Sequence, residues 1–141
     1  MNLLTEKDHQ QDFLAQQILA VIGYGSQGKA HAMNLRDSGY QVIIGARLGG
    51  QSATQASQDG FAVYDVVEAA KKAQLIALLT PDMAQAEVYQ SIQAELCTHK
   101  TLLFAHGFNI HYGIIQAPKD IDVVMIAPKG PGQLVLSLIH I

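Results

Sequence analysis

Short apolar runs alternate with longer amphipathic stretches along the chain, and this alternation constrains the fold more than any other feature. The run Ile18 to Ile22 (ILAVI) ends at a glycine and is typical of a strand buried on both faces. Strands are predicted at residues 18–22, 41–44, 61–64, 75–79, 101–105 and 121–127, and helices at 26–38, 52–59, 65–73 and from residue 80 onward. Because strands that alternate with helices form right-handed βαβ units, the sequence predicts an α/β fold with a doubly wound parallel sheet.

Two helix ends carry local signals. Gly39 follows the predicted helix 26–38 and is expected to cap its C-terminus, because glycine adopts the left-handed conformation that ends many helices. Thr80 is the predicted N-cap of the fourth helix, with Pro81 at the first helical position, where a missing N–H costs nothing.

Composition excludes several classes of protein. The 141 residues leave room for one domain, and 49% apolar with 15% charged residues is typical of a folded core. The formal charge of −3 is scattered, which argues against a nucleic-acid partner. A lone cysteine, Cys97, cannot form an intrachain disulfide and favours a reducing compartment. No apolar run reaches the roughly 18–20 residues that span a bilayer, and the N-terminus lacks a basic start, so we expect a soluble, cytoplasmic protein without a membrane partner.

A glycine-rich segment follows the first predicted strand directly. Residues 23–28 read Gly-Tyr-Gly-Ser-Gln-Gly, a G-x-G-x-x-G between a strand and a helix, which is the context of a dinucleotide-binding turn of the Rossmann type. Gly23 permits the tight turn, Gly25 lets a diphosphate approach the backbone, and Gly28 lets helix and strand pack closely. The N-terminus of the helix then offers free N–H groups to the phosphates. The alternative is a tight turn that binds no ligand.

The end of the second predicted strand indicates which dinucleotide is bound. NAD-binding turns place an acid there, whereas this strand is followed by Arg47, with Ser52 a few residues further on. A cation suits the 2′-phosphate of NADP and a carboxylate would repel it, so NADP is predicted. The alternative is that Arg47 is a solvent-exposed loop charge.

Two further candidates follow later strands. His106 comes directly after the strand 101–105, and Lys129 lies in the Pro- and Gly-rich loop after the last strand. Ligands of doubly wound sheets bind beyond the carboxyl ends of the strands, so these side chains could position and polarise a carbonyl that is being reduced. His106 could equally be structural, and His111 is expected to pack or cap. No H-x-x-x-H pair or Cys/His cluster is present, so no metal site is predicted.

Four segments together resemble the N-terminal domain of ketol-acid reductoisomerase. They are GYGSQGKAHAMNLRDSG (23–39), LLTPDMAQAEVY (78–89), FAHGFNIHYG (104–113) and MIAPKGPG (125–132), and the resemblance runs from about residue 13 to 135. It implies an enzyme of valine, leucine and isoleucine biosynthesis that acts on 2-acetolactate or 2-aceto-2-hydroxybutyrate. Such enzymes use Mg²⁺ to drive an alkyl shift and then reduce the resulting keto acid with NADPH.

The resemblance also implies individual site residues. Its phosphate turn corresponds to Gly23, Tyr24, Gly25, Ser26, Gln27 and Gly28, its 2′-phosphate contacts to Arg47 and Ser52, and its other cofactor contacts to Asp82, Met83, Ala84, Gln85 and Gly132. His106 matches the active-site histidine and Lys129 an active-site lysine. Two positions depart from the family pattern: Gly50 replaces a frequent serine, and Lys29 replaces a frequent histidine.

In this family the magnesium ligands come from a C-terminal helical domain that also forms the dimer, and we expect that domain to be absent here. The predicted organisation is a lead-in at 1–17, an NADP-binding domain at 18–135 and a non-family tail at 136–141. One reverse translation of the tail, LSLIHI, resembles a transposon end used in sequencing libraries, so the tail is interpreted as translated adapter. The chain alone is expected to bind NADPH weakly or not at all and to be inactive, whereas the full-length protein is expected to be a homo-oligomer.

Two other interpretations stay open at this point. One is a reductase of the hydroxyacid-dehydrogenase or imine-reductase type, which shares the fold and cofactor but lacks the AHGFNIH and APKGPG segments in this arrangement. The other is a non-enzymatic domain that senses the redox state of the nucleotide, which would need the glycine turn but neither His106 nor Lys129.

Overall fold

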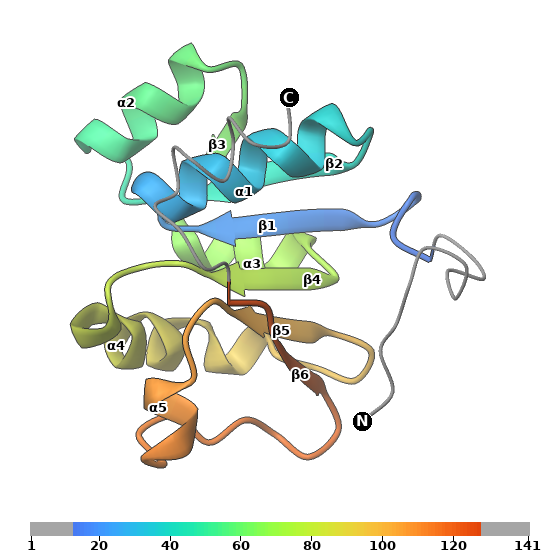
Figure 1. The fold of residues 1–141 in the computed structure, drawn as a ribbon, viewed down its shortest axis with the longest axis vertical. Helices are drawn as coiled ribbons and strands as arrows, with labels where there is room; N and C mark the ends of the chain where they lie inside the picture. The colour runs from blue at the N-terminus through green and yellow to red at the C-terminus, as the bar shows by residue number, and fades with distance from the viewer. Residues whose placement is uncertain (1–12, 128–141) are drawn as a thin grey trace.

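A six-stranded, all-parallel sheet forms the centre of the molecule (Figure 1). The computed structural model describes residues 13–127. The strands lie in the order β3-β2-β1-β4-β5-β6. Their bounds are β1 Ile18–Ile22, β2 Gln41–Gly45, β3 Ala62–Tyr64, β4 Leu75–Leu78, β5 Thr101–Phe104 and β6 Asp122–Met125. The predicted doubly wound α/β fold is confirmed.

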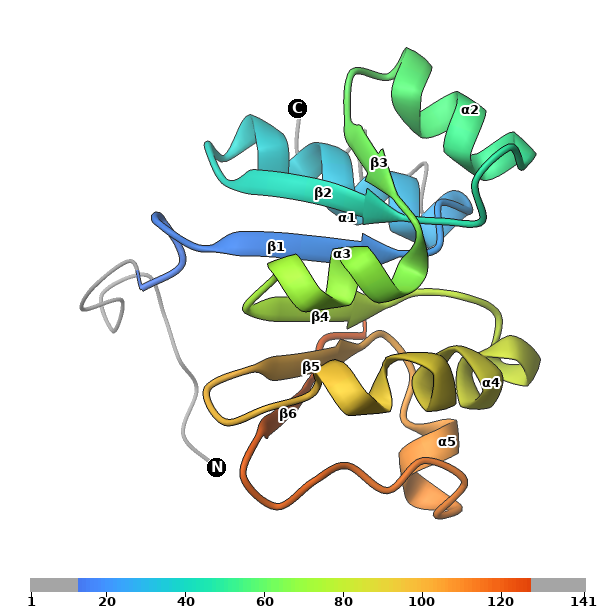
Figure 2. The same ribbon diagram turned by 180° about the vertical axis from the view of Figure 1, so that it is seen from behind.

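Helices cover both faces of the sheet (Figures 1 and 2). Their bounds are α1 Ser26–Asp37, α2 Gln51–Gln58, α3 Val66–Lys72, α4 Asp82–Ile92 and α5 Phe108–His111, with a 3-10 turn, η2, at Gln93–Glu95. Side chains of β1 alternate between two cores: Leu19 and Val21 pack with α1 and α2, whereas Ala20 and Ile22 pack with α3 and α4. This alternation explains the continuous apolar runs, because each strand is buried on both sides.

Helix ends follow the predictions at one position and depart from them at another. Gly39 has a φ of +91° and its N–H bonds to the carbonyl of Arg36, while the N–H of Tyr40 bonds to that of Leu35. This is the Schellman arrangement, so the predicted glycine stop is confirmed. The predicted start of the fourth helix was wrong by one residue. Pro81 is the N-cap rather than Thr80, because its extended backbone (ψ 144°) turns its carbonyl toward the N–H groups of the first turn.

The order of the strands places one crevice at the carboxyl edge of the sheet. The chain winds from β1 outward to β3 and then returns to β4 on the other side of β1. The connections after β1 and β4 therefore diverge to opposite faces, and this switch point is where doubly wound sheets bind their ligands. None of the described helices is long and apolar enough to cross a membrane.

Candidate dinucleotide-binding site

A cleft of about 850 Å³ opens at the switch point between β1 and β4. Three segments form most of its lining: the turn between β1 and α1, the loop between β2 and α2, and the loop between β4 and α4. Val66 of α3 and Val88 of α4 also line it. The cleft thus brings together the predicted residues 23–27, Arg47 and Ser52, which lie far apart in the sequence. Parallel pairing of β1 with β2 and β4 places their carboxyl ends side by side and so assembles the site.

The glycines of the turn serve different purposes. Gly23 has a φ of +94°, and a Cβ atom there would lie 2.9 Å from the Thr80 methyl group. A Cβ on Gly28 would lie 2.0 Å from the Gly23 carbonyl oxygen, so α1 can pack on the turn only without a side chain. A Cβ on Gly25 would meet nothing within 4 Å, and its φ of −83° suits any residue. Neither backbone conformation nor protein packing therefore requires a glycine at position 25, whereas a ligand lying against the backbone would.

The three described helices whose N-caps line this cleft begin without a side-chain cap. The N-caps of α1, α2 and α4 are Gly25, Gly50 and Pro81, and none of them accepts a side-chain hydrogen bond from its helix. By contrast, α3 is capped by Asp65, which accepts bonds from the N–H groups of Val67 and Glu68. Uncapped N-termini carry partial positive charge and free donors, so the cleft offers anion-binding groups at several points.

The loop between β2 and α2 carries the side chains predicted to select the cofactor. Arg47 and Ser52 are exposed and both line the cleft, with Gly50 between them. The N–H of Gly50 donates to the carbonyl of Arg47 (3.0 Å), which closes a tight turn. Among the described residues that line the cleft, none is acidic. This part of the cleft suits a phosphate, because nothing in it repels a negative charge.

Tyr24 contributes to the cleft in a way that the sequence did not indicate. Its hydroxyl donates to Oδ2 of Asp59 (2.9 Å) and its ring packs edge-to-face on Phe61. Burial and the Asp59 carboxylate raise the pKa of Tyr24 above its ordinary value. The side chain is thus committed to protein contacts, which leaves the backbone N–H for the predicted phosphate contact.

His106 lies beside a smaller cavity of about 280 Å³, which it shares with Asp82 and Thr80. Its Nδ1 accepts a hydrogen bond from the N–H of Phe108 (3.2 Å), while Asp82 Oδ2 is 3.9 Å from the same nitrogen. The shorter contact decides the tautomer, because a nitrogen whose lone pair accepts a hydrogen bond from Phe108 carries no hydrogen to donate to Asp82. Neutral His106 therefore carries its proton on Nε2 and can act as a hydrogen-bond donor.

Thr80 connects the cleft to the cavity beside His106. It lines both of them, and its hydroxyl oxygen is buried with no hydrogen-bond partner among the described residues. Sequence reasoning assigned Thr80 to helix capping and missed this position. A buried hydroxyl without a partner costs about 1–3 kcal/mol, which a bound ligand that supplied the partner would recover.

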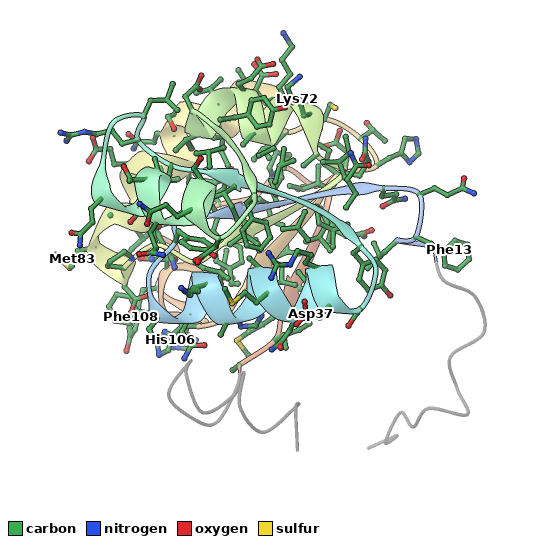
Figure 3. The ribbon with its side chains drawn as sticks, turned by 90° about the horizontal axis from the view of Figure 1, so that it is seen from above. Phe13, Asp37, Lys72, Met83, His106 and Phe108 are labelled. Carbon is green, nitrogen blue, oxygen red and sulfur yellow. The ribbon has the colours of Figure 1, made fainter. Side chains whose placement is uncertain are left out.

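Of the cofactor contacts predicted at the start of α4, one side chain is exposed to solvent and another is buried in the protein. The side chain of Met83 is 94% exposed and projects from the edge of the molecule (Figure 3). Gln85 is buried: its Nε2 donates to the carbonyl of Thr80 (3.1 Å), and its Oε1 accepts from Asn109 (2.9 Å). Asn109 also donates to the carbonyl of Asp82 (3.0 Å), so a pair of amides that was not predicted ties α5 to α4. The cofactor contacts of Asp82, Met83, Ala84 and Gln85 stay predictions.

Some predicted residues are not placed by the structure. Lys129, Gly132 and the tail 136–141 lie outside the described residues. His111 ends α5 and packs edge-to-face against Tyr112. Within residues 13–127 no group of three or more His, Cys, Asp or Glu side chains could hold a metal ion.

The parallel sheet, the glycine turn and the uncapped helices together define a dinucleotide-binding domain of the Rossmann type. The family model for "Acetohydroxy acid isomeroreductase, NADPH-binding domain" matches residues 13–140. The chain therefore belongs to the acetohydroxy acid isomeroreductase family, whose members are also called ketol-acid reductoisomerases. The match extends past residue 135, so the domain boundary at that residue stays a prediction.

Solved structures agree with this assignment. An NADH-preferring ketol-acid reductoisomerase from an uncultured archean superimposes with a TM-score of 0.90 at 40% identity, over 97% of this chain and 43% of that one. This chain thus spans less than half the length of that relative. The Mycobacterium tuberculosis 3-hydroxyisobutyrate dehydrogenase (TM-score 0.70, 16% identity, 86% of this chain and 43% of that one) shares the fold. So does an imine reductase from Myxococcus stipitatus (TM-score 0.62, 20% identity, 84% and 42%).

Proposed function

We propose that this chain is the cofactor-binding part of a ketol-acid reductoisomerase, which converts 2-acetohydroxy acids to 2,3-dihydroxy acids in branched-chain amino acid biosynthesis. The observation that carries the proposal is the open space beside Gly25, in a turn whose other two glycines are required by the fold. The family match and the 40% identity to a reductoisomerase support it.

NADPH is the cofactor that we assign to the cleft. The amides at the start of α1 would hold the diphosphate, and Arg47, Ser52 and the start of α2 would hold the 2′-phosphate. When bound, the reduced nicotinamide supplies a hydride. The similar archaeal enzyme prefers NADH, so the choice between the two cofactors is a property of the individual chain.

His106 acts on the substrate as a hydrogen-bond donor. Its Nε2–H would bind the oxygen of the 2-keto group and stabilise the negative charge that grows on that oxygen during reduction. The Phe108 amide holds the ring in this tautomer. Lys129 is proposed to add a positive charge at the same site. In the full-length protein Mg²⁺ would act as a Lewis acid during the alkyl shift, with ligands outside the described residues.

The remaining assignments concern the full-length protein. We propose a homo-oligomer that works in the cytoplasm on 2-acetolactate or 2-aceto-2-hydroxybutyrate, without nucleic-acid or membrane partners. The free, exposed Cys97 suits a reducing compartment.

Two assays test the proposal. NMR titration of the ¹⁵N-labelled chain with NADPH measures Kd values into the millimolar range, where binding contributes about −4 kcal/mol. In the second assay, the full-length gene product is mixed with 2-acetolactate and Mg²⁺, and NADPH oxidation is followed. Oxidation that depends on all three components is expected. Equal oxidation of NADPH with a 3-oxo acid, the oxidised form of a 3-hydroxy acid, in place of 2-acetolactate would contradict the proposal.

A further inference from the structure

The carboxylate of Asp59 joins the glycine turn to helices α1 and α2. Its Oδ2 binds Lys29 Nζ (2.8 Å), at the start of α1, and accepts from the hydroxyl of Tyr24 (2.9 Å), in the turn. Its Oδ1 accepts from Nε2 of Gln55 (3.2 Å), on α2. We name these four residues the Asp59 cluster. The hydrogen bond from Lys29 holds the pKa of Asp59 below its ordinary value, which keeps the carboxylate charged.

Hydrogen bonds also hold the backbone of Asp59. Asp59 is the C-cap of α2, and its carbonyl accepts a hydrogen bond from Nη1 of Arg36 (2.7 Å). The guanidinium of Arg36 also lies over the ring of Phe61, 4.7 Å from its centroid. The C-terminal end of α2 is therefore tied to α1 through the side chain and through the main chain.

We propose that Asp59 is a positioning residue for the cofactor, and that the Asp59 cluster sets the preference for a 2′-phosphorylated dinucleotide. The inference rests on the proposed function. Helix α2 has eight residues; its start lines the cleft at Gly50, Gln51 and Ser52, and its other end is anchored in the cluster. Because α2 is only eight residues long, a displacement of its anchored end would also shift Ser52 relative to the diphosphate turn.

The two dinucleotides depend on this separation to different degrees. Both need the turn at residues 23–28, but only NADPH carries a phosphate that must reach Arg47 and the start of α2 at the same time. Displacement of α2 therefore weakens the binding of NADPH more than the binding of NADH, because positioned hydrogen bonds to a charged group are sensitive to small shifts.

The decisive variant is Asp59→Asn, because loss of the positioning role and loss of the negative charge predict opposite changes in the affinity for NADPH. The carboxamide is isosteric but uncharged: its NH2 group faces either Lys29 and Tyr24 or Gln55, and the ion pair with Lys29 is lost in both cases, so the cluster loosens. We expect the Kd for NADPH to rise on the order of tenfold and that for NADH about twofold, with both measured by NMR titration. Loss of a negative charge near the cleft would instead strengthen the binding of the more anionic NADPH.

Lys29→Met tests the same anchor from the other side, and Lys72→Met is its matched control. Lys72 makes an exposed ion pair with Glu68 (3.2 Å) on α3, away from the cleft. Lys29→Met is expected to raise the ratio of the NADPH Kd to the NADH Kd, and Lys72→Met to leave that ratio unchanged. Amide hydrogen exchange provides a readout without cofactor: Asp59→Asn should speed exchange in α2 and leave α3 as in the wild type.

Each outcome decides a different point. If the wild type binds NADPH and Asp59→Asn keeps the wild-type ratio of Kd values, the positioning role is wrong and the proposed function stands. If the wild type binds neither dinucleotide and the full-length gene product does not oxidise NADPH with 2-acetolactate and Mg²⁺, the proposed function is wrong, and the cofactor preference with it. Unchanged exchange in α2 of Asp59→Asn overturns the anchor whatever the titrations show.

Discussion

Substitution of Gly25 and Gly28 by alanine separates ligand contact from folding. At Gly28 the new methyl group would lie 2.0 Å from the carbonyl oxygen of Gly23, a backbone atom that cannot move aside without reshaping the turn. Overpacking of this kind against the main chain is expected to lower the free energy of unfolding by about 3 kcal/mol or more. At Gly25 the methyl group meets no protein atom within 4 Å.

Gly25→Ala is therefore expected to fold almost as well as the wild type. Loss of glycine at the N-cap of α1 costs about 1 kcal/mol, and the lower entropy of the unfolded chain offsets roughly 0.4–1 kcal/mol of that. Urea denaturation should place Gly25→Ala within about 1 kcal/mol of the wild type. The methyl group would, however, occupy the position where the diphosphate approaches the amides at the start of α1.

The effect on binding is the opposite of the effect on stability. Displacing the diphosphate from two of these amides removes two hydrogen bonds to a charged group, for a loss of about 3 kcal/mol or roughly a hundredfold in affinity. In the NMR titration NADPH should then cause no measurable shifts in Gly25→Ala. Wild-type affinity in a folded Gly25→Ala protein would refute the reasoning, because it would mean that the open space at residue 25 is not where the cofactor lies.

Three further substitutions test other parts of the structure. Thr80→Val should leave the free energy of unfolding unchanged or raise it by about 1 kcal/mol, because the buried hydroxyl has no partner among the described residues. The same change should weaken the binding of NADPH about fivefold. Unchanged affinity by titration would exclude Thr80 from the site. Lys100→Met should lower the free energy of unfolding by about 2–3 kcal/mol in urea denaturation, since the buried ammonium donates to the carbonyls of Ala70 (2.5 Å) and Lys71 (3.0 Å) at the end of α3. An equal loss in the exposed control Lys119→Met would contradict this. Burial holds the pKa of His31 below its ordinary value of 6.5, so the neutral ring stabilises the fold above that pH and this contribution is lost as the pH falls toward the folded-state pKa. The wild type should lose stability between about pH 7.5 and 5, and His31→Gln should lose less over the same range.

The strands and the glycine turn could be predicted because their signals are local. A parallel strand buried on both faces gives a continuous apolar run, and β1 and β4 each begin at the predicted residue. The last strand was predicted too long, 121–127 against Asp122–Met125, because apolar character continues past the last paired residue of this edge strand. Helix α5 was missed because four residues after a glycine show no periodicity.

Contacts between distant residues were beyond the reach of sequence patterns. Asp59 lies 35 positions from Tyr24 and Asn109 lies 24 from Gln85, and in each pair the partners are ordinary polar residues at unremarkable spacings. Lys29 was seen as a departure from the family pattern without a reason, and the structure supplies one in its ion pair with Asp59. The sequence therefore located the phosphate turn but not the contacts that hold α2 beside it.

The central claim is that the start of α1 holds the diphosphate of a nicotinamide dinucleotide. The most direct test is to assign the amide signals of the ¹⁵N-labelled chain and to titrate the chain with NADPH. The account predicts that the largest shifts fall on residues 25–28, with a second group at Arg47 and residues 50–52 that NADH perturbs less. Shifts concentrated around His106 and Tyr112, with residues 25–28 unmoved at saturating NADPH, would contradict it.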